Sequence, residues 1–196
     1  LALLPVTQSF VYLHVGDVAE IKISEYTIYN TKGEVQQRPV RQVDKTQDGV
    51  DKGHYRHYMQ KEIFEQVLAM QSTLEGRIAM RGILPAILGP DAESLLPTIE
   101  RVQIIACGTS YHAGWVAKYW IESIAKVPCA IDIASEYRYR DKVIEPNTLL
   151  IAISQSGETA DTLSAFRQAK SFCQATMAIC NVPESALVRE ADLVFM

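Results

Sequence analysis

The stretch TLLIAISQSGETADTL, residues 148–163, decides the fold of the C-terminal half of this chain. Its first six residues form an uncharged apolar run, which is typical of a strand buried on both faces. Ser154 to Thr159 then supply hydroxyls, an amide and Gly157, without any Lys or Arg, and a helical pattern begins at residue 160. A buried strand that passes through a polar turn into a helix is the repeating unit of a parallel α/β sheet.

The same alternation fills the chain from about residue 101 onward. The clearest helical segments are 110–125 and 160–173, and the apolar runs lie at 102–107, 129–134, 148–153, 176–180 and 193–196. Strands that alternate with helices predict a doubly wound α/β domain with parallel strands and right-handed crossovers. Because the chain starts without Met and stops within its fifth predicted strand, we expect it to be a fragment of a longer protein.

The N-terminal part follows a different pattern. Residues 1 to about 40 predict short antiparallel strands, which turn signals divide into the runs 10–13, 19–23 and 26–29. The polar residues 39–53 are interpreted as a linker.

An amphipathic helix is predicted after this linker, because apolar residues recur at every third or fourth position. The apolar stripe consists of Met59, Ile63, Val67, Met70, Leu74 and Ile78. In the favoured interpretation the helix packs within its own domain, and contact with a partner subunit is the alternative. Shorter helical pieces are predicted over 80–88 and 91–99.

Composition argues against several classes of function. The chain has 19 basic and 23 acidic residues, and its net charge of -4 argues against binding to nucleic acid or to an anionic membrane surface. No apolar stretch approaches the roughly 20 residues that span a bilayer. The opening Leu1–Leu4 is too short for a signal peptide. We therefore predict no membrane association.

The cysteines and histidines give no sign of a disulfide framework or a metal site. The four cysteines form no C-x-x-C pair, which favours free thiols in a reducing, cytoplasmic location. His54 and His57 have the spacing of half a zinc site, but no further ligands follow, so we predict no metal. G-x-G-x-x-G and G-K-[ST] are both absent, so neither a dinucleotide cofactor nor a P-loop is supported and no cofactor is expected.

Two loops carry the residues that suggest a ligand. The first strand of the α/β region leads into Cys107–Ser110 and the third into Ser154–Thr159. In a parallel sheet both loops lie at the carboxyl edge, where ligands bind, and each opens a helix whose free N–H groups face the rim. Further donors are the hydroxyls of Ser110, Ser154, Ser156 and Thr159. We predict a reversible phosphate site that holds its ligand without a cation.

The structural alternative is that these residues only shape the two turns. Ser and Thr are ordinary N-caps, and glycine eases a strand-to-helix turn. Either loop alone fits that alternative equally well, whereas two such loops at different strand ends favour a phosphate site. Glu158 suits the first turn of its own helix, where a carboxylate faces the positive end of the dipole, and we assign it no catalytic role.

Several segments resemble the glutamine–fructose-6-phosphate aminotransferase family. The segments ACGTSYHAG, ASEYRYR, SQSGETADTL and AICNVPESALVREAD are similar to its first sugar-isomerase (SIS) domain. The segment DKGHYRHYMQKEIFEQ is similar to the connection between its glutaminase and isomerase domains, and LALLPVTQSFVYLHVGDVAEI to its last glutaminase strands. The resemblance covers nearly the whole chain and is weakest over 79–99. Departures from the family pattern at Val67 and at His14–Val15 lie away from the sugar site.

The resemblance implies a domain organisation and a function. Residues 1–40 would be the C-terminal strands of a glutaminase (Ntn-hydrolase) domain, 41–92 a linker with a helical segment, and 93–196 a truncated first SIS domain, a flavodoxin-like three-layer sandwich. The family moves ammonia from glutamine to fructose 6-phosphate and forms glucosamine 6-phosphate, the first step of hexosamine synthesis. By this resemblance Thr109 lies against the sugar, and the phosphate is held by Ser110, Ser154, Gln155, Ser156 and Thr159.

The resemblance also implies what these residues do not supply. The family's nucleophilic Cys and its isomerase acid and base residues belong to segments outside residues 1–196, so we expect no catalytic residue here and an inactive chain. The intact protein is expected to be a homodimer. The alternative is a non-catalytic phosphosugar sensor, because SIS domains also occur in regulators. Such regulators carry a DNA-reading helical module before the domain, whereas strands and one long helix are predicted there in this chain.

Overall fold

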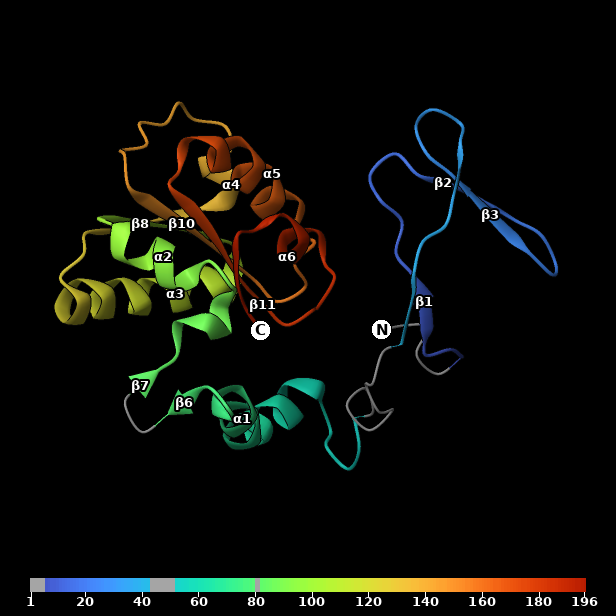
Figure 1. Cartoon of the computed structure of the whole chain (residues 1–196). Helices are drawn as coiled ribbons and strands as arrows, with labels where there is room; N and C mark the ends of the chain where they lie inside the picture. Colours follow the sequence, from blue (N-terminus) through green and yellow to red (C-terminus); the bar gives the residue numbers. More distant parts are fainter. Residues whose placement is uncertain (1–5, 43–51, 80–81) are drawn as a thin grey trace. The chain divides into compact units, whose positions relative to one another are not determined.

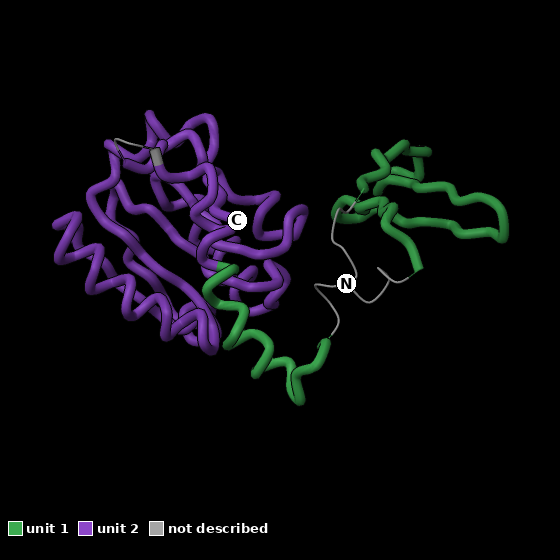
Figure 2. Tube along the Cα trace, turned by 90° about the horizontal axis from the view of Figure 1, so that it is seen from below, with its two compact units in different colours: residues 1–69 green, residues 70–196 purple. Residues whose placement is uncertain are grey.

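The computed structural model of the chain describes residues 6–42, 52–79 and 82–196 (Figure 1). The chain divides into two compact units, residues 1–69 and residues 70–196 (Figure 2). The strands of the first unit are β1 (Ser9–Val11), β2 (Val18–Ile21), β3 (Tyr26–Tyr29), β4 (Val35–Gln36) and β5 (Val40–Gln42). Helix α1 (Tyr58–Leu74) crosses the boundary between the units.

The first unit contains the antiparallel strands that the sequence predicts. β2, β3 and β4 form one antiparallel sheet, and β1 pairs with β5 in another. The interpretation of 39–53 as a linker is wrong for Val40–Gln42, because these residues form β5, in which Val40 lies opposite Val11. Residues 43–51 of that predicted linker lie outside the described residues.

A partly buried ion pair fixes the turn between β1 and β2. Asp17 accepts hydrogen bonds from Nε and Nη2 of Arg38 at 2.8 and 2.9 Å, and from the backbone N of His14 at 2.8 Å. These bonds, above all those from Arg38, lower the pKa of Asp17 to about 2. The turn is thereby joined to the residues that follow β4.

The predicted amphipathic helix is confirmed as α1, but it ends earlier than its apolar stripe suggests. Gly76 has a φ of +70°, the left-handed conformation that terminates helices. Ile78 consequently lies in β6 (Ile78–Ala79), which pairs with β7 (Gly82–Ile83). The helical prediction over 80–88 is therefore wrong at β7, and residues 80 and 81 lie outside the described residues.

The segment before the main sheet is helical only in short pieces. Residues 85–88 form a 3-10 turn, and α2 (Ala92–Leu95) is followed by another over 96–98. These elements confirm the prediction over 91–99 and the last part of that over 80–88.

The second unit is built on a five-stranded parallel sheet in the order β12-β11-β10-β8-β9. Its strands are β8 (Arg101–Ala106), β9 (Cys129–Ile133), β10 (Thr148–Ser154), β11 (Ala175–Cys180) and β12 (Leu193–Phe195). Each lies within one residue of a predicted apolar run. Counted along the chain, the order is 2-1-3-4-5, which is the flavodoxin-like arrangement of a doubly wound sheet. The predicted fold class is confirmed.

Helices cover both faces of this sheet (Figure 1). The helices are α3 (Gly108–Trp120), α4 (Ala134–Tyr137), α5 (Ala160–Ala169) and α6 (Ala186–Glu190). α2 and α3 pack on the face that presents Leu149 and Ile151, while α4, α5 and α6 pack on the face that presents Leu150 and Ala152. Successive side chains of β10 therefore point into two different cores, one on each face of the sheet, as expected for a central strand buried on both sides.

Two helices escaped sequence analysis because of their length. α4 has four residues and α6 has five. Neither completes two helical turns, so an apolar period of three or four residues cannot appear in them.

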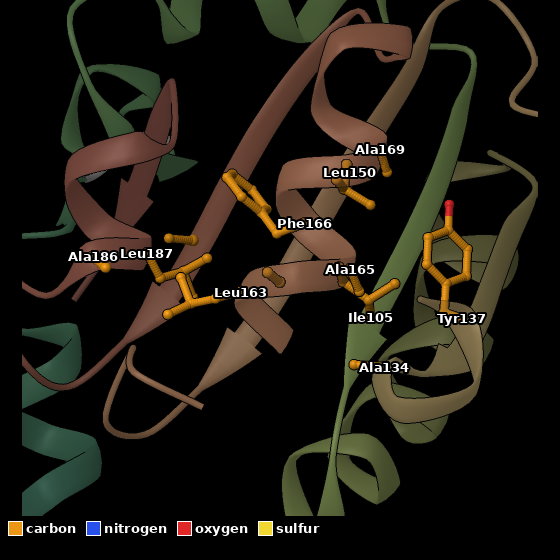
Figure 3. Packing of buried hydrophobic residues seen from close by; sticks show 12 residues of the cluster. Ile105, Ala134, Tyr137, Leu150, Leu163, Ala165, Phe166, Ala169, Ala186 and Leu187 are labelled. Atoms are coloured by element: carbon orange, nitrogen blue, oxygen red, sulfur yellow. The ribbon is translucent and has the colours of Figure 1, made fainter. Parts of the chain in front are cut away.

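The core over α5 centres on Phe166, whose side chain lies between α5 and the sheet (Figure 3). Phe166 is fully buried and shares its cluster with Leu150, Leu163 and Leu187. A second phenylalanine in the same unit, Phe172, is 68% exposed. Because the side chains are identical, the difference in burial should determine their contributions to stability.

We expect Phe166→Ala to lower the free energy of unfolding by about 3–5 kcal/mol, because it removes a buried ring and leaves a cavity. Phe172→Ala is the matched control and should change it by less than about 0.5 kcal/mol. Urea denaturation followed by circular dichroism measures both. Equal effects of the two substitutions would contradict the assignment of this core.

Candidate functional site

The candidate site lies at the carboxyl edge of the sheet, where β8 and β10 are direct neighbours. From β8 the chain crosses to β9 on one side, and from β10 it crosses to β11 on the other. The loops after these two strands therefore diverge from one point, which is the topological switch where open α/β sheets bind ligands. These are the two loops that sequence analysis selected.

Each of the two strands leads into a helix at this point. α3 begins at Gly108 and α5 at Ala160, and the two helices cover opposite faces of the sheet. Their first N–H groups lack intrahelical acceptors and carry the positive end of the helix dipole. The rim between β8 and β10 is thus flanked by two helix N-termini, which favours an anion.

α3 packs unusually close to the sheet. A Cβ added at Gly114 would lie 2.4 Å from Cδ1 of Ile131 and 3.1 Å from Cγ2 of Ile104. A glycine at this position lets the backbone of α3 approach the strands closely. This close packing helps to position the N-terminus of α3 at the rim.

The loop after β10 is organised by its own side chains. Ser154 is buried, and its Oγ accepts a hydrogen bond from the N of Gly157 at 3.1 Å. The same Oγ lies 3.1 Å from Oγ1 of Thr159, and Oγ of Ser156 accepts from the N of Glu158 at 3.2 Å. The loop thus brings the hydroxyls of Ser154 and Thr159 together, and all three predicted hydroxyls already take part in a loop hydrogen bond.

The other predicted residues are open to solvent. Thr109 and Gln155 are exposed and Ser110 is half-buried. Across the described ranges, the side chains of these three residues form no hydrogen bond with another protein group. Their hydroxyl and amide groups are available to a ligand at the rim.

The two loops are joined beneath the rim. Oγ1 of Thr162, in the first turn of α5, lies 3.9 Å from Sγ of Cys107, the first residue of the loop after β8. Cys107 also packs against the core over α5. The first loop and the start of α5 therefore belong to one packed unit.

Glu158 corrects a prediction made from the sequence. It precedes Thr159, the N-cap of α5, and its Oε1 accepts a hydrogen bond at 2.7 Å from the N of Ala186, the first residue of α6. The carboxylate therefore caps a different helix from the one that follows it in the chain. This cap was not predictable from the sequence, because α6 has five residues and is too short to show a helical period.

Formal charges at the rim are engaged with neighbouring elements. Asp161, in the first turn of α5, pairs with Nη1 of Arg138 at 2.5 Å. Arg138 was not selected from the sequence. No Lys or Arg occurs in either loop, so any anion held there would depend on hydroxyls, an amide and backbone N–H groups.

Two of the cysteines are at least partly buried thiols of low reactivity. All four are free thiols, and burial raises the pKa of Cys129 and that of Cys173 to about 11. Such thiols are protonated at neutral pH, and the thiolate is the reactive form. Among the residues that the structure describes, no group of three or more His, Cys, Asp and Glu side chains gathers to hold a metal ion.

The backbone of the β10 loop depends on Gly157. Its φ is +66°, and an added Cβ would lie 2.1 Å from Oγ of Ser185 and 2.8 Å from Sγ of Cys180. Cys180 ends β11 and Ser185 lies in the segment that follows it, so Gly157 is one point where the candidate loop touches its neighbour.

None of the helices in the described part of the chain is both long enough and apolar enough to cross a membrane.

Comparison with known proteins gives one consistent result. A family model described as SIS domain matches residues 95–196. The chain is 55% identical to the glutamine–fructose-6-phosphate aminotransferase [isomerizing] of Haemophilus ducreyi and 52% identical to that of Idiomarina loihiensis. Each match covers 100% of this chain and 32% of the relative, so the chain spans about a third of these proteins.

A solved structure is similar as well. It is the C-terminal domain of glucosamine-fructose-6-phosphate aminotransferase from Francisella tularensis, with a TM-score of 0.70 and 49% sequence identity. The match covers 74% of this chain and 41% of that one.

We expect Gly157→Ala to lower the free energy of unfolding by at least about 2 kcal/mol, because it combines a left-handed backbone with a steric clash. Gly76→Ala is the matched control, since Gly76 has a φ of +70° and nothing lies within 4 Å of the added Cβ. The control should show only the backbone cost, about 1 kcal/mol. Thermal or urea unfolding measures both variants, and equal losses would mean that the contact with Ser185 carries no weight.

Proposed function

The chain belongs to the SIS domain family, and we propose that its C-terminal unit binds the phosphate of fructose 6-phosphate at the rim between β8 and β10. The observation that carries this proposal is the meeting of two hydroxyl-bearing loops and two helix N-termini at one switch point. A phosphate there would meet N–H donors, hydroxyls and the positive ends of two helix dipoles. Lacking a bidentate Arg, the site should release its ligand readily.

The proposed ligands differ in how the fold uses them. Ser110 and Gln155 have side chains with no protein partner in the described part of the chain, so they are proposed to contact the phosphate directly. Thr109, which is also exposed, is proposed to lie against the sugar. The hydroxyls of Ser154, Ser156 and Thr159 are proposed to complete the site while they also hold the loop together.

We propose that the chain acts as part of an enzyme rather than as a sensor. The supporting observation is that the identity to aminotransferases extends over the whole chain, including the strands and helix before residue 95. The proposed reaction converts fructose 6-phosphate and glutamine into glucosamine 6-phosphate and glutamate, at the start of hexosamine synthesis. The domain assignment 1–40, 41–92 and 93–196 is part of the same proposal.

A homodimer in the intact protein and a cytoplasmic location are also proposed. The outer face of α3 and the turn after it expose large apolar side chains, namely Trp115, Val116, Tyr119, Trp120 and Ile124. Exposed apolar surface of this kind is typical of contact surfaces and supports association. The four free thiols support a reducing compartment.

We expect fructose 6-phosphate to bind the chain and fructose not to bind measurably, because the phosphate supplies the charge that the helix ends recognise. Ser110→Ala should weaken binding by roughly 10- to 100-fold, the range for losing a hydrogen bond to a charged group. Isothermal titration calorimetry measures the affinities.

Ser123→Ala is the matched control for this experiment. Ser123 is exposed and lies just after the C-terminal end of α3, far along the helix from Ser110. Its Oγ donates a hydrogen bond to the O of Trp120. Its loss should leave the affinity unchanged. Equal affinities of Ser110→Ala and the unaltered chain, or equal binding of fructose and fructose 6-phosphate, would contradict the proposed site.

We further expect the chain to form no glucosamine 6-phosphate from fructose 6-phosphate and ammonia. Moving a proton between sugar carbons needs a general base within hydrogen-bond reach, and the carboxylate of Glu158 is engaged at α6. A coupled assay of the purified chain, with glutamine or with added ammonia, measures the product. Turnover with ammonia alone would contradict this expectation and would make Glu158 and His112 the first residues to test.

A further inference from the structure

Glu158 connects the candidate phosphate loop to a neighbouring helix. Its Oε1 accepts the N–H of Ala186 at 2.7 Å, at the first residue of α6. A carboxylate at a helix N-terminus is favoured by the dipole, and its hydrogen bond is strengthened by its charge. The side chain therefore ties the segment between β10 and α5 to the start of α6.

Two backbone hydrogen bonds run beside this tie. The N of Leu187 donates to the O of Gly157 at 3.2 Å, and the N of Asn181 donates to the O of Gln155 at 3.2 Å. Gly157 also lies so close to Ser185 that a Cβ would not fit between them. The loop is thus attached along one side to the residues from Asn181 to Leu187, and Glu158 is its side-chain anchor.

The same residue is joined to the hydroxyls on the other side of the loop. The N–H of Glu158 donates to Oγ of Ser156, and the residue that follows it is Thr159, whose Oγ1 contacts Ser154. A shift of Glu158 would therefore move the hydroxyls of Ser156 and Thr159. Both belong to the proposed phosphate site.

The negative charge of Glu158 matters for phosphate binding as well. A carboxylate in a loop that holds a phosphate would repel it if the side chain could turn toward the ligand. Bound to the N–H of Ala186, the carboxylate is directed to α6 and its charge is partly balanced by the helix dipole. The anchor thus shapes the loop and keeps a negative charge engaged elsewhere.

We propose that Glu158 is a positioning residue, which holds the loop Ser154–Thr159 against α6 so that its hydroxyls are preset for a sugar phosphate. This inference rests on the proposed phosphate site. The property that matters is the acceptor oxygen of the side chain, so Gln at this position should retain the function while Ala should lose it.

The experiment compares the full chain with Glu158→Ala, Glu158→Gln and the control Glu93→Ala, an exposed carboxylate in α2. Fructose 6-phosphate affinity is measured by calorimetry. Glu158→Ala should weaken binding by roughly 3- to 30-fold, the range that corresponds to a lost helix cap. The affinities of Glu158→Gln and Glu93→Ala should remain within about twofold of that of the unaltered chain. In both variants the side chain at position 158 still offers an oxygen that accepts the N–H of Ala186.

Amide NMR without ligand tests the anchor separately. The signals of Gly157 and Ala186 should shift in Glu158→Ala and return toward their original positions in Glu158→Gln. Unchanged signals in Glu158→Ala would overturn the inference whatever the affinities are. Tighter binding in both Glu158 variants would also overturn it, because Glu158 would then act only by repelling the phosphate.

The two proposals fail in different ways. If the unaltered chain does not bind fructose 6-phosphate, the proposed function fails, and the amide signals alone decide whether Glu158 anchors the loop. If the unaltered chain binds and Glu158→Ala binds equally well, the proposed function stands and the positioning role is overturned.

Discussion

The parallel pairing of β8 with β10 is the constraint on which the second unit depends. It runs from Arg101 opposite Thr148 to Ala106 opposite Ile153, although β9 lies between these strands in the chain. Because the chain leaves the two strands in opposite directions, α3 and α5 begin at the same edge and cover opposite faces. The apolar residues of β10 have to satisfy both cores, and the polar residues begin where those cores end.

A rim built in this way can attract an anion without a formal cation. Two helix N-termini and several hydroxyls provide partial positive charge, while Asp161 is paired with Arg138 and Glu158 with the N–H of Ala186. Neutral donors bind phosphate less tightly than a bidentate Arg does. Such a site suits a metabolite that must be released after each cycle, which agrees with the proposed function.

The sequence was sufficient for the sheet and for the location of the loops, because each depends on local patterns. The apolar runs and their flanking helices predicted a parallel, doubly wound sheet, and the hydroxyl clusters pointed to the ends of β8 and β10. Contacts between segments distant in sequence were not predictable. The bond of Glu158 to Ala186 depends on a five-residue helix, and the fit of Gly157 against Ser185 depends on how two loops meet in space.

The same contacts explain how a loop rich in small polar residues can stay ordered at a sheet edge. Small polar side chains compete locally for backbone hydrogen bonds and would allow several loop conformations. The attachment to Asn181, Ser185 and Leu187 removes that freedom from one side of the loop, since each contact involves its backbone. The side chain of Gln155 stays exposed, as does that of Thr109 in the loop after β8, where Ser110 is half-buried. A loop ordered in advance loses little conformational entropy when a ligand binds, so even weak neutral donors can give specific recognition.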